Sequence, residues 1–215
     1  MIRLFSTKAG EVARTRKSER TAVGVEGLED RALMTAGFNL ADTLNARDTI
    51  DIQRLNVVQQ IEQLRLVNSS QLQQVIANGQ DQTNALVVQY TNLLAQENAD
   101  RLAGDTAAVA ADRLAERQTL VQIKGIRVLM QQATRTANTV DSTLARDENN
   151  VNRTFNNTQR NLSRGNNPFL TVPHAVNAIN VFGAQAQQHA DKGTAILSSI
   201  NDQILSVLTP LTPVD

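Results

Sequence analysis

The side chains best suited to acid–base or metal chemistry in this chain are two histidines. His174 and His189 lie 15 residues apart, and His189 has a carboxylate, Asp191, two residues further on. Metal sites built on helices use histidine and carboxylate ligands spaced three or four residues apart, because only that spacing puts them on one face. We therefore interpret both histidines as partly exposed helix residues, and we expect no metal site.

Two adjacent carboxylate pairs, Glu29-Asp30 and Asp147-Glu148, are the remaining candidates for acid–base work. Neighbouring residues diverge around a helix, so we predict solvated charges and no shared acid–base site. The sequence contains no glycine-rich phosphate loop, nucleophile elbow or calcium-loop pattern. It also contains no cysteine, which excludes disulfides and thiol chemistry. We expect no catalytic residue, no cofactor, no small-molecule substrate and no enzymatic activity.

The composition favours thin layers of packing between helices. Aromatic residues make up 3% of the chain, and there is no tryptophan. Large rings usually dominate a compact core, so we expect Ala, Val, Ile and Leu to fill the space between helices. The chain has 20 Asn and 20 Gln, interleaved with spaced apolar residues. We interpret these amides as solvated helix faces.

Charge is unevenly distributed along a chain whose formal net charge is zero. Residues 1–20 contain six basic and two acidic residues, so the body of the protein is weakly acidic. Such a body has little attraction for nucleic acid. No apolar run reaches 18 residues, so we expect no membrane-spanning helix. Association with a membrane surface is not favoured, because few aromatic residues and lysines flank the apolar positions.

Residues 1–37 differ from the rest, and we predict a disordered basic leader there. Within it, the segment 25–36 reads VEGLEDRALMTA. This segment resembles the LEDR motif near the N-terminus of many predicted exported proteins of planctomycete bacteria. The matching positions are Glu26, Leu28, Glu29, Asp30, Arg31, Leu33 and Ala36. The resemblance covers about a dozen residues, implies export, and says nothing about the activity of the body.

Apolar residues recur every three or four positions from residue 38 to residue 163, which predicts long helices. Asn78-Gly79 and Gly104-Asp105 are the candidate breaks, and the sequence leaves open whether either is a turn or lies within continuous helix. Residues 105–163 alternate steps of three and four, as a coiled-coil seam does. The residues we expect to pack in the seam are Leu55, Val58, Ile61, Val140, Leu144 and Val151.

Gly165 and Pro168 provide the clearest helix-ending signal in the chain. Beyond them we predict a C-terminal helical hairpin over residues 168–209, followed by a disordered tail at 210–215. Its first helix would open at Pro173 and end near Gly193, and its second would begin at Thr194.

These patterns predict an all-α fold: an elongated, antiparallel, coiled-coil-like helical bundle with a shorter C-terminal hairpin. We expect a non-catalytic structural or protein-interaction protein that associates with itself or with a protein partner. The leader favours export to the cell envelope or exterior, with the cytoplasm as the alternative. The second functional hypothesis is an amphipathic protein that coats lipid or a hydrophobic granule, in the manner of phasins.

Overall fold

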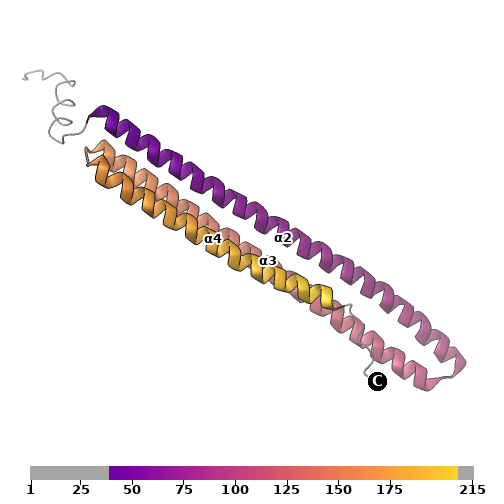
Figure 1. Ribbon diagram of the computed structural model, residues 1–215. Coiled ribbons are helices and arrows are strands. Elements are labelled where there is room, and N and C mark those ends of the chain that lie inside the picture. The colour runs from indigo at the N-terminus through magenta and orange to yellow at the C-terminus, as the bar shows by residue number, and fades with distance from the viewer. Residues whose placement is uncertain (1–38, 208–215) are drawn as a thin grey trace, which may run out of the picture.

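The computed structural model describes residues 39–207, which form three long helices and no strand. The helices are α2 (Leu40–Ala103), α3 (Thr106–Ser163) and α4 (Pro168–Ser206). At about 1.5 Å per residue they are roughly 96, 87 and 58 Å long. They pack side by side as an elongated bundle in which α3 runs antiparallel to both α2 and α4 (Figure 1). This confirms the predicted all-α, elongated bundle.

Each helix begins at a side chain that caps its free N–H groups. Asn39 accepts a hydrogen bond from the Asp42 N–H at 2.7 Å, and Asp105 accepts from the N–H groups of Ala107 and Ala108. Asn167 accepts from the Phe169 N–H at 2.9 Å. Asn and Asp are favoured at this position because their side-chain oxygen reaches the first exposed N–H groups.

The two turns are built alike, on glycines with left-handed backbone. Gly104 has φ 79° and Gly165 has φ 81°. In the first turn, the N–H groups of Gly104 and Asp105 donate to the last free carbonyls of α2. A side chain at either glycine would strain this conformation, so both positions are turns, and Gly104 divides residues 38–163 into two helices.

The predicted C-terminal hairpin is wrong, because α4 is one continuous helix through Gly193. Gly193 is buried inside α4, where a Cβ atom would collide with the Val140 side chain of α3. Gly79 likewise lies inside α2, facing Met130. These glycines therefore permit close helix packing and are not turns. Pro173 also lies within α4 and does not open it. The helix begins at Pro168, in the first helical position, where a missing N–H costs nothing.

The core consists of aliphatic residues that are buried at seven-residue intervals, so that one strip of each helix faces the bundle axis. In α3 two such series run along the helix, and the first has polar residues toward its two ends and apolar residues between them. Its members are Asp112, Thr119, Ile126, Ala133, Val140 and Asp147, all of them buried.

Most of the predicted seam is confirmed. Ile61, Val140, Leu144 and Val151 are buried. Val58 is partly buried against the same core, whereas Leu55 is 50% exposed, so its assignment to the seam is wrong. The buried positions nearest to it in α2 are 50, 57 and 61. Residue 55 is two positions from residue 57, which places it on the opposite side of the helix.

The third helix is shorter than the hairpin on which it packs. The Gln122 side-chain amide of α3 donates to the Val207 carbonyl at the end of α4, and Asn78 of α2 donates to Asn201 of α4 at 2.7 Å. Beyond this level α2 and α3 continue as a pair to their turn at Gly104 (Figure 1). We call residues 87–121 the distal hairpin.

The close contact at Gly193 generates a stability prediction. We expect Gly193→Ala to destabilise the protein by about 1–3 kcal/mol, because the added methyl group overpacks the α3–α4 contact at Val140. Chemical denaturation followed by circular dichroism measures this change.

Gly125 is the matched control, since it lies in α3 with no atom within 4 Å of a Cβ added there. Gly125→Ala should stabilise the protein by about 0.5–1 kcal/mol through helix propensity alone. If both substitutions are stabilising, α4 does not approach α3 closely at Gly193.

Candidate functional site

A histidine and an aspartate from different helices meet at the bundle axis. His189 of α4 lies with its Nδ1 atom 2.9 Å from Oδ2 of Asp147 in α3. The Asp147 side chain is 3% exposed and that of His189 is 30% exposed. The two residues are 42 positions apart in the sequence, so no local spacing could have paired them.

The predicted solvated pair at Asp147-Glu148 is wrong, since both carboxylates have cross-helix partners. Asp147 occupies a buried position in the seven-residue series of α3. Glu148 turns toward α2 and accepts a hydrogen bond from Arg65 at 2.7 Å. The neighbouring residues diverge as expected on a helix, but each reaches a different helix. The two contacts hold α3 in register with α4 and with α2.

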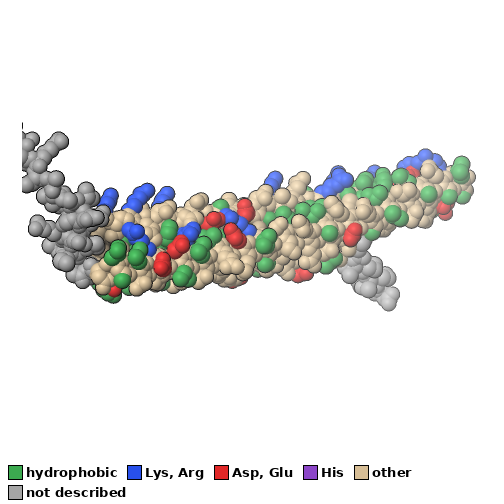
Figure 2. All heavy atoms as spheres, turned by 90° about the horizontal axis from the view of Figure 1, so that it is seen from above, with side chains coloured by type: hydrophobic (Ala, Val, Ile, Leu, Met, Phe, Trp, Pro, Cys, Tyr) green, Lys and Arg blue, Asp and Glu red, His purple; other side chains and the backbone are tan. Residues whose placement is uncertain are grey.

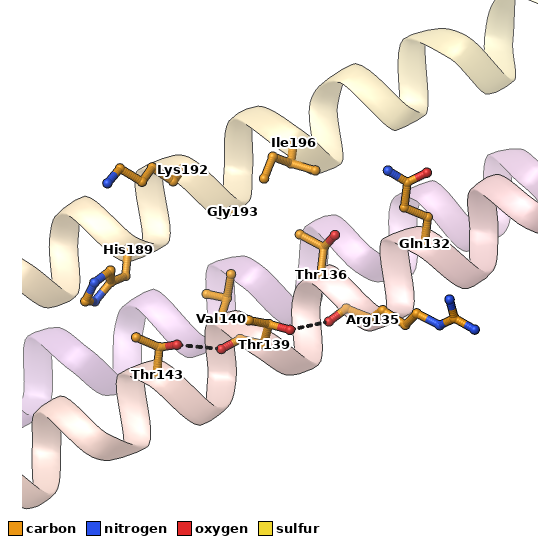
Figure 3. Close-up of a pocket in the computed structure, with 10 residues that line it drawn as sticks. All are labelled: Gln132, Arg135, Thr136, Thr139, Val140, Thr143, His189, Lys192, Gly193 and Ile196. Atoms are coloured by element: carbon orange, nitrogen blue, oxygen red, sulfur yellow. Dashed lines mark hydrogen bonds between the residues drawn. The ribbon is translucent and has the colours of Figure 1, made fainter.

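A shallow groove of about 360 Å³ lies beside His189, between α3 and α4. Two of its three threonine hydroxyls are already used, because Thr139 and Thr143 donate to carbonyls one turn earlier in α3. The two basic side chains at its rim, Arg135 and Lys192, extend in different directions (Figure 3). The groove therefore lacks the convergent polar groups that fix a small ligand.

A second charged cluster lies in the distal hairpin, where α4 no longer covers α2 and α3. Glu97 of α2 is 7% exposed. Its Oε1 atom accepts from Arg101 of the same helix at 2.6 Å and from Arg113 of α3 at 2.9 Å. The hydrogen bonds from Arg113 and then Arg101 lower the pKa of Glu97 against the opposing effect of burial. Glu97 thus ties α2 to α3 as a carboxylate.

Two further carboxyl groups of this cluster lack such partners. Asp112 is 6% exposed, and its Oδ2 atom is enclosed without a hydrogen-bond partner, as is Oε1 of Glu116. Burial and then the neighbouring Asp100 carboxyl group raise the pKa of Asp112. Burial and then Glu97 raise the pKa of Glu116. An enclosed carboxylate without a donor is costly, so the distal hairpin carries unsatisfied negative charge.

Polar pairs between α2 and α4 complete the interhelical contacts. Gln53 donates to Asn180, Gln60 to Gln187 and Asn78 to Asn201. The first two pairs are seven residues apart on both helices. The interpretation of the amides as solvated helix faces is therefore incomplete, because some of them hold α2 and α4 in register. No sequence signal distinguishes these amides from the exposed ones.

The LEDR-like residues, from Glu26 to Ala36, lie outside the described residues, as do the predicted leader and tail. Within residues 39–207, no three His, Cys, Asp or Glu side chains are grouped so that they could hold a metal ion. In the same range, no helix is long and apolar enough to cross a membrane.

Comparison with known proteins returned no match: no family model fits the sequence, and no curated protein or solved structure resembles it significantly.

The His189–Asp147 contact generates the second prediction. His189→Ala should destabilise the protein by about 1–3 kcal/mol, because it leaves a buried carboxyl oxygen without its partner. Denaturant unfolding measures the loss. In an Asp147→Asn background the same substitution should cost less, since the buried charge is gone.

His174→Ala is the control, because His174 is exposed on the same helix, and it should change stability by less than about 0.5 kcal/mol. Equal effects of the two alanine substitutions would contradict a structural role for the His189–Asp147 contact.

The distal carboxyl groups generate a pH prediction with two opposing parts. Asp112 and Glu116 have raised pKa values in the folded chain, so their contribution to stability grows as the pH falls through those values and is lost as it rises. Glu97 has a lowered pKa, so its contribution is present at neutral pH and is lost only on stronger acidification. Protection of the distal hairpin should therefore rise as the pH falls from neutral toward the ordinary range of carboxyl groups, and then fall on stronger acidification.

Hydrogen exchange of residues 87–121, corrected for the intrinsic pH dependence of exchange, measures this profile. The combined substitution Asp112→Asn and Glu116→Gln should abolish the rise and leave the fall. A protection that decreases steadily from pH 7 would show that these carboxyl groups do not repel their neighbours.

Proposed function

We propose that this protein is a non-catalytic, coiled-coil-like rod that acts as a structural or protein-interaction element, exported to the cell envelope or exterior. The observation that carries the proposal is the distal hairpin. There α2 and α3 continue as a pair beyond the end of α4. Within residues 39–207, this two-helix segment has no third helix against one side of its seam, and that side can receive a helix of another chain.

The distribution of polar contacts supports an interaction role. The buried polar side chains of Asn68, Glu97 and Asp147 each form a hydrogen bond with a neighbouring helix. Buried polar groups of this kind specify register and partner choice in helical assemblies. An enzyme requires instead that such groups converge on a space for substrate.

The apolar surface of the distal hairpin gives the proposal its second support. Side chains that are at least half exposed there include Val88, Leu102 and Leu114, with Leu102 91% exposed. Figure 2 shows hydrophobic side chains reaching the narrow end of the rod beside basic ones. Exposed apolar groups rimmed by charge are typical of protein contact surfaces. Export rests on the LEDR resemblance alone.

The alternative function, a coat on lipid or a hydrophobic granule, has one observation in its favour. Several large apolar side chains of α2 face outward, among them Ile52, Leu55 and Leu66, all at least half exposed. A coating protein would lay such residues on the apolar surface by separating its helices.

Scattering and flotation distinguish the two functions. A rod about 96 Å long has a radius of gyration near 28 Å, against roughly 17 Å for a compact chain of this length. We expect the full chain to keep the larger value and to remain unbound when mixed with phosphatidylglycerol–phosphatidylethanolamine vesicles. The coating function would be favoured if the chain floats with the vesicles and if, in their presence, His189→Ala no longer lowers the stability of the protein. Cell fractionation tests export, and a chain retained entirely in the cytosol would contradict it.

A further inference from the structure

The buried series of α3 contains two aspartates in equivalent positions with different surroundings. Asp147 and Asp112 lie 35 residues apart, five intervals of seven, and both are buried. Asp147 meets His189, which α4 supplies at 2.9 Å. Asp112 lies beyond the end of α4, and among the described residues its Oδ2 atom has no donor: the neighbouring polar group is another carboxyl, that of Asp100. The position that receives a basic side chain in the three-helix part thus lacks one in the distal hairpin.

The residues around Asp112 repeat the surface on which α4 packs. Thr136, Val140 and Thr143 of α3 line the groove beside α4. Four intervals of seven earlier, the same positions are Ala108, Asp112 and Ala115. Both alanines are partly buried and small, so a third helix can approach at least as closely there as α4 does at Thr136 and Thr143.

The charge at this surface selects the occupant. Both arginines of the cluster, Arg101 and Arg113, bind the same oxygen of Glu97. Asp112 and Glu116 each keep an enclosed oxygen without a donor, and Asp100 adds a further negative charge close to Asp112. A basic side chain would compensate this charge, whereas an acidic one would add to the repulsion.

The available length fits a short helix. Gln122 is level with the end of α4, and α3 begins at Thr106. The part of α3 that lies beyond the end of α4, among the described residues, is therefore about 24 Å long, or between four and five helical turns, with Asp112 about 15 Å beyond Gln122.

We propose that the distal hairpin binds an α-helix of a partner protein, which continues the path of α4 and places an arginine or lysine against Asp112. This inference rests on the proposed interaction function and specifies its site and partner chemistry. The partner helix presents small or aliphatic residues to Ala108 and Ala115, and its basic residue supplies to Asp112 what His189 supplies to Asp147.

Two stapled, fluorescein-labelled helical peptides of 18 residues test the proposal on the full chain. Both have an alanine–leucine seam, and they differ only in a central arginine or glutamate facing the seam. Fluorescence anisotropy should show the arginine peptide binding at least about tenfold more tightly, the factor expected of one charge-assisted hydrogen bond. Equal binding of both peptides to the unmodified chain, or binding of neither, would overturn the proposal.

Charge reversal gives an independent measurement at the same site. Asp112→Lys should invert the preference, so that the glutamate peptide binds more tightly, whereas Asp202→Asn, at an exposed position of α4, should leave it unchanged. Circular dichroism checks that each variant is folded. Failure of a folded Asp112→Lys chain to invert the preference would contradict the assignment of Asp112.

The remaining outcomes separate this inference from the proposed function. If sedimentation shows a dimer that Asp112→Lys dissociates, while neither peptide binds, the occupant is a second copy of the chain and the partner assignment is overturned. If the rod persists in scattering but the two peptides bind equally, the inference fails alone. If the chain floats with vesicles yet prefers the arginine peptide, the inference survives and the structural-rod function fails.

Discussion

Burial of one continuous strip on each helix is the constraint on which this structure depends. A single long helix is marginally stable in water, and most of its stability in a protein comes from packing one apolar face. Here the buried positions of α3 recur every seven residues, and those of α4 alternate three and four residues apart from Gly183 to Ile204. The strips are narrow and aliphatic, so the helices must approach closely. Gly193 provides that approach where α4 crosses Val140.

Polar groups within the strip determine which arrangement of the three helices forms. An aliphatic seam alone would tolerate sliding by one interval of seven residues. The contact of Asn68 with the Ala137 carbonyl and that of His189 with Asp147 would both be lost by such a shift. Unpaired buried polar groups cost more than their contacts contribute, so these groups disfavour the shifted registers.

The cost of an unpaired buried polar group also explains why the position at which α4 ends is important. Where three helices are present, the buried aspartate of α3 has a basic partner. Where only two remain, Glu97 uses both nearby arginines and Asp112 is left without a donor. The distal hairpin is therefore the part of the described rod in which the packing of the fold is incomplete. The Asp112 carboxyl without a donor weakens the isolated hairpin, and in the proposed function the same group selects the partner.

The helical class and the strong stop at Gly165-Pro168 follow from local chemistry and were predictable from the sequence. Periodic apolar residues and the backbone restrictions of glycine and proline act within a few positions. The roles of Gly79, Gly104 and Gly193 were not predictable in this way. A glycine inside a helix costs only about 1 kcal/mol, so packing against Met130 or Val140 outweighs that cost at two of the three. Pairs such as Arg65 with Glu148, 83 residues apart, depend on how the helices align. Long-range packing also buries Asp112 and Asp147. Their burial was not predictable, because it depends on residues of other helices that are distant in the sequence.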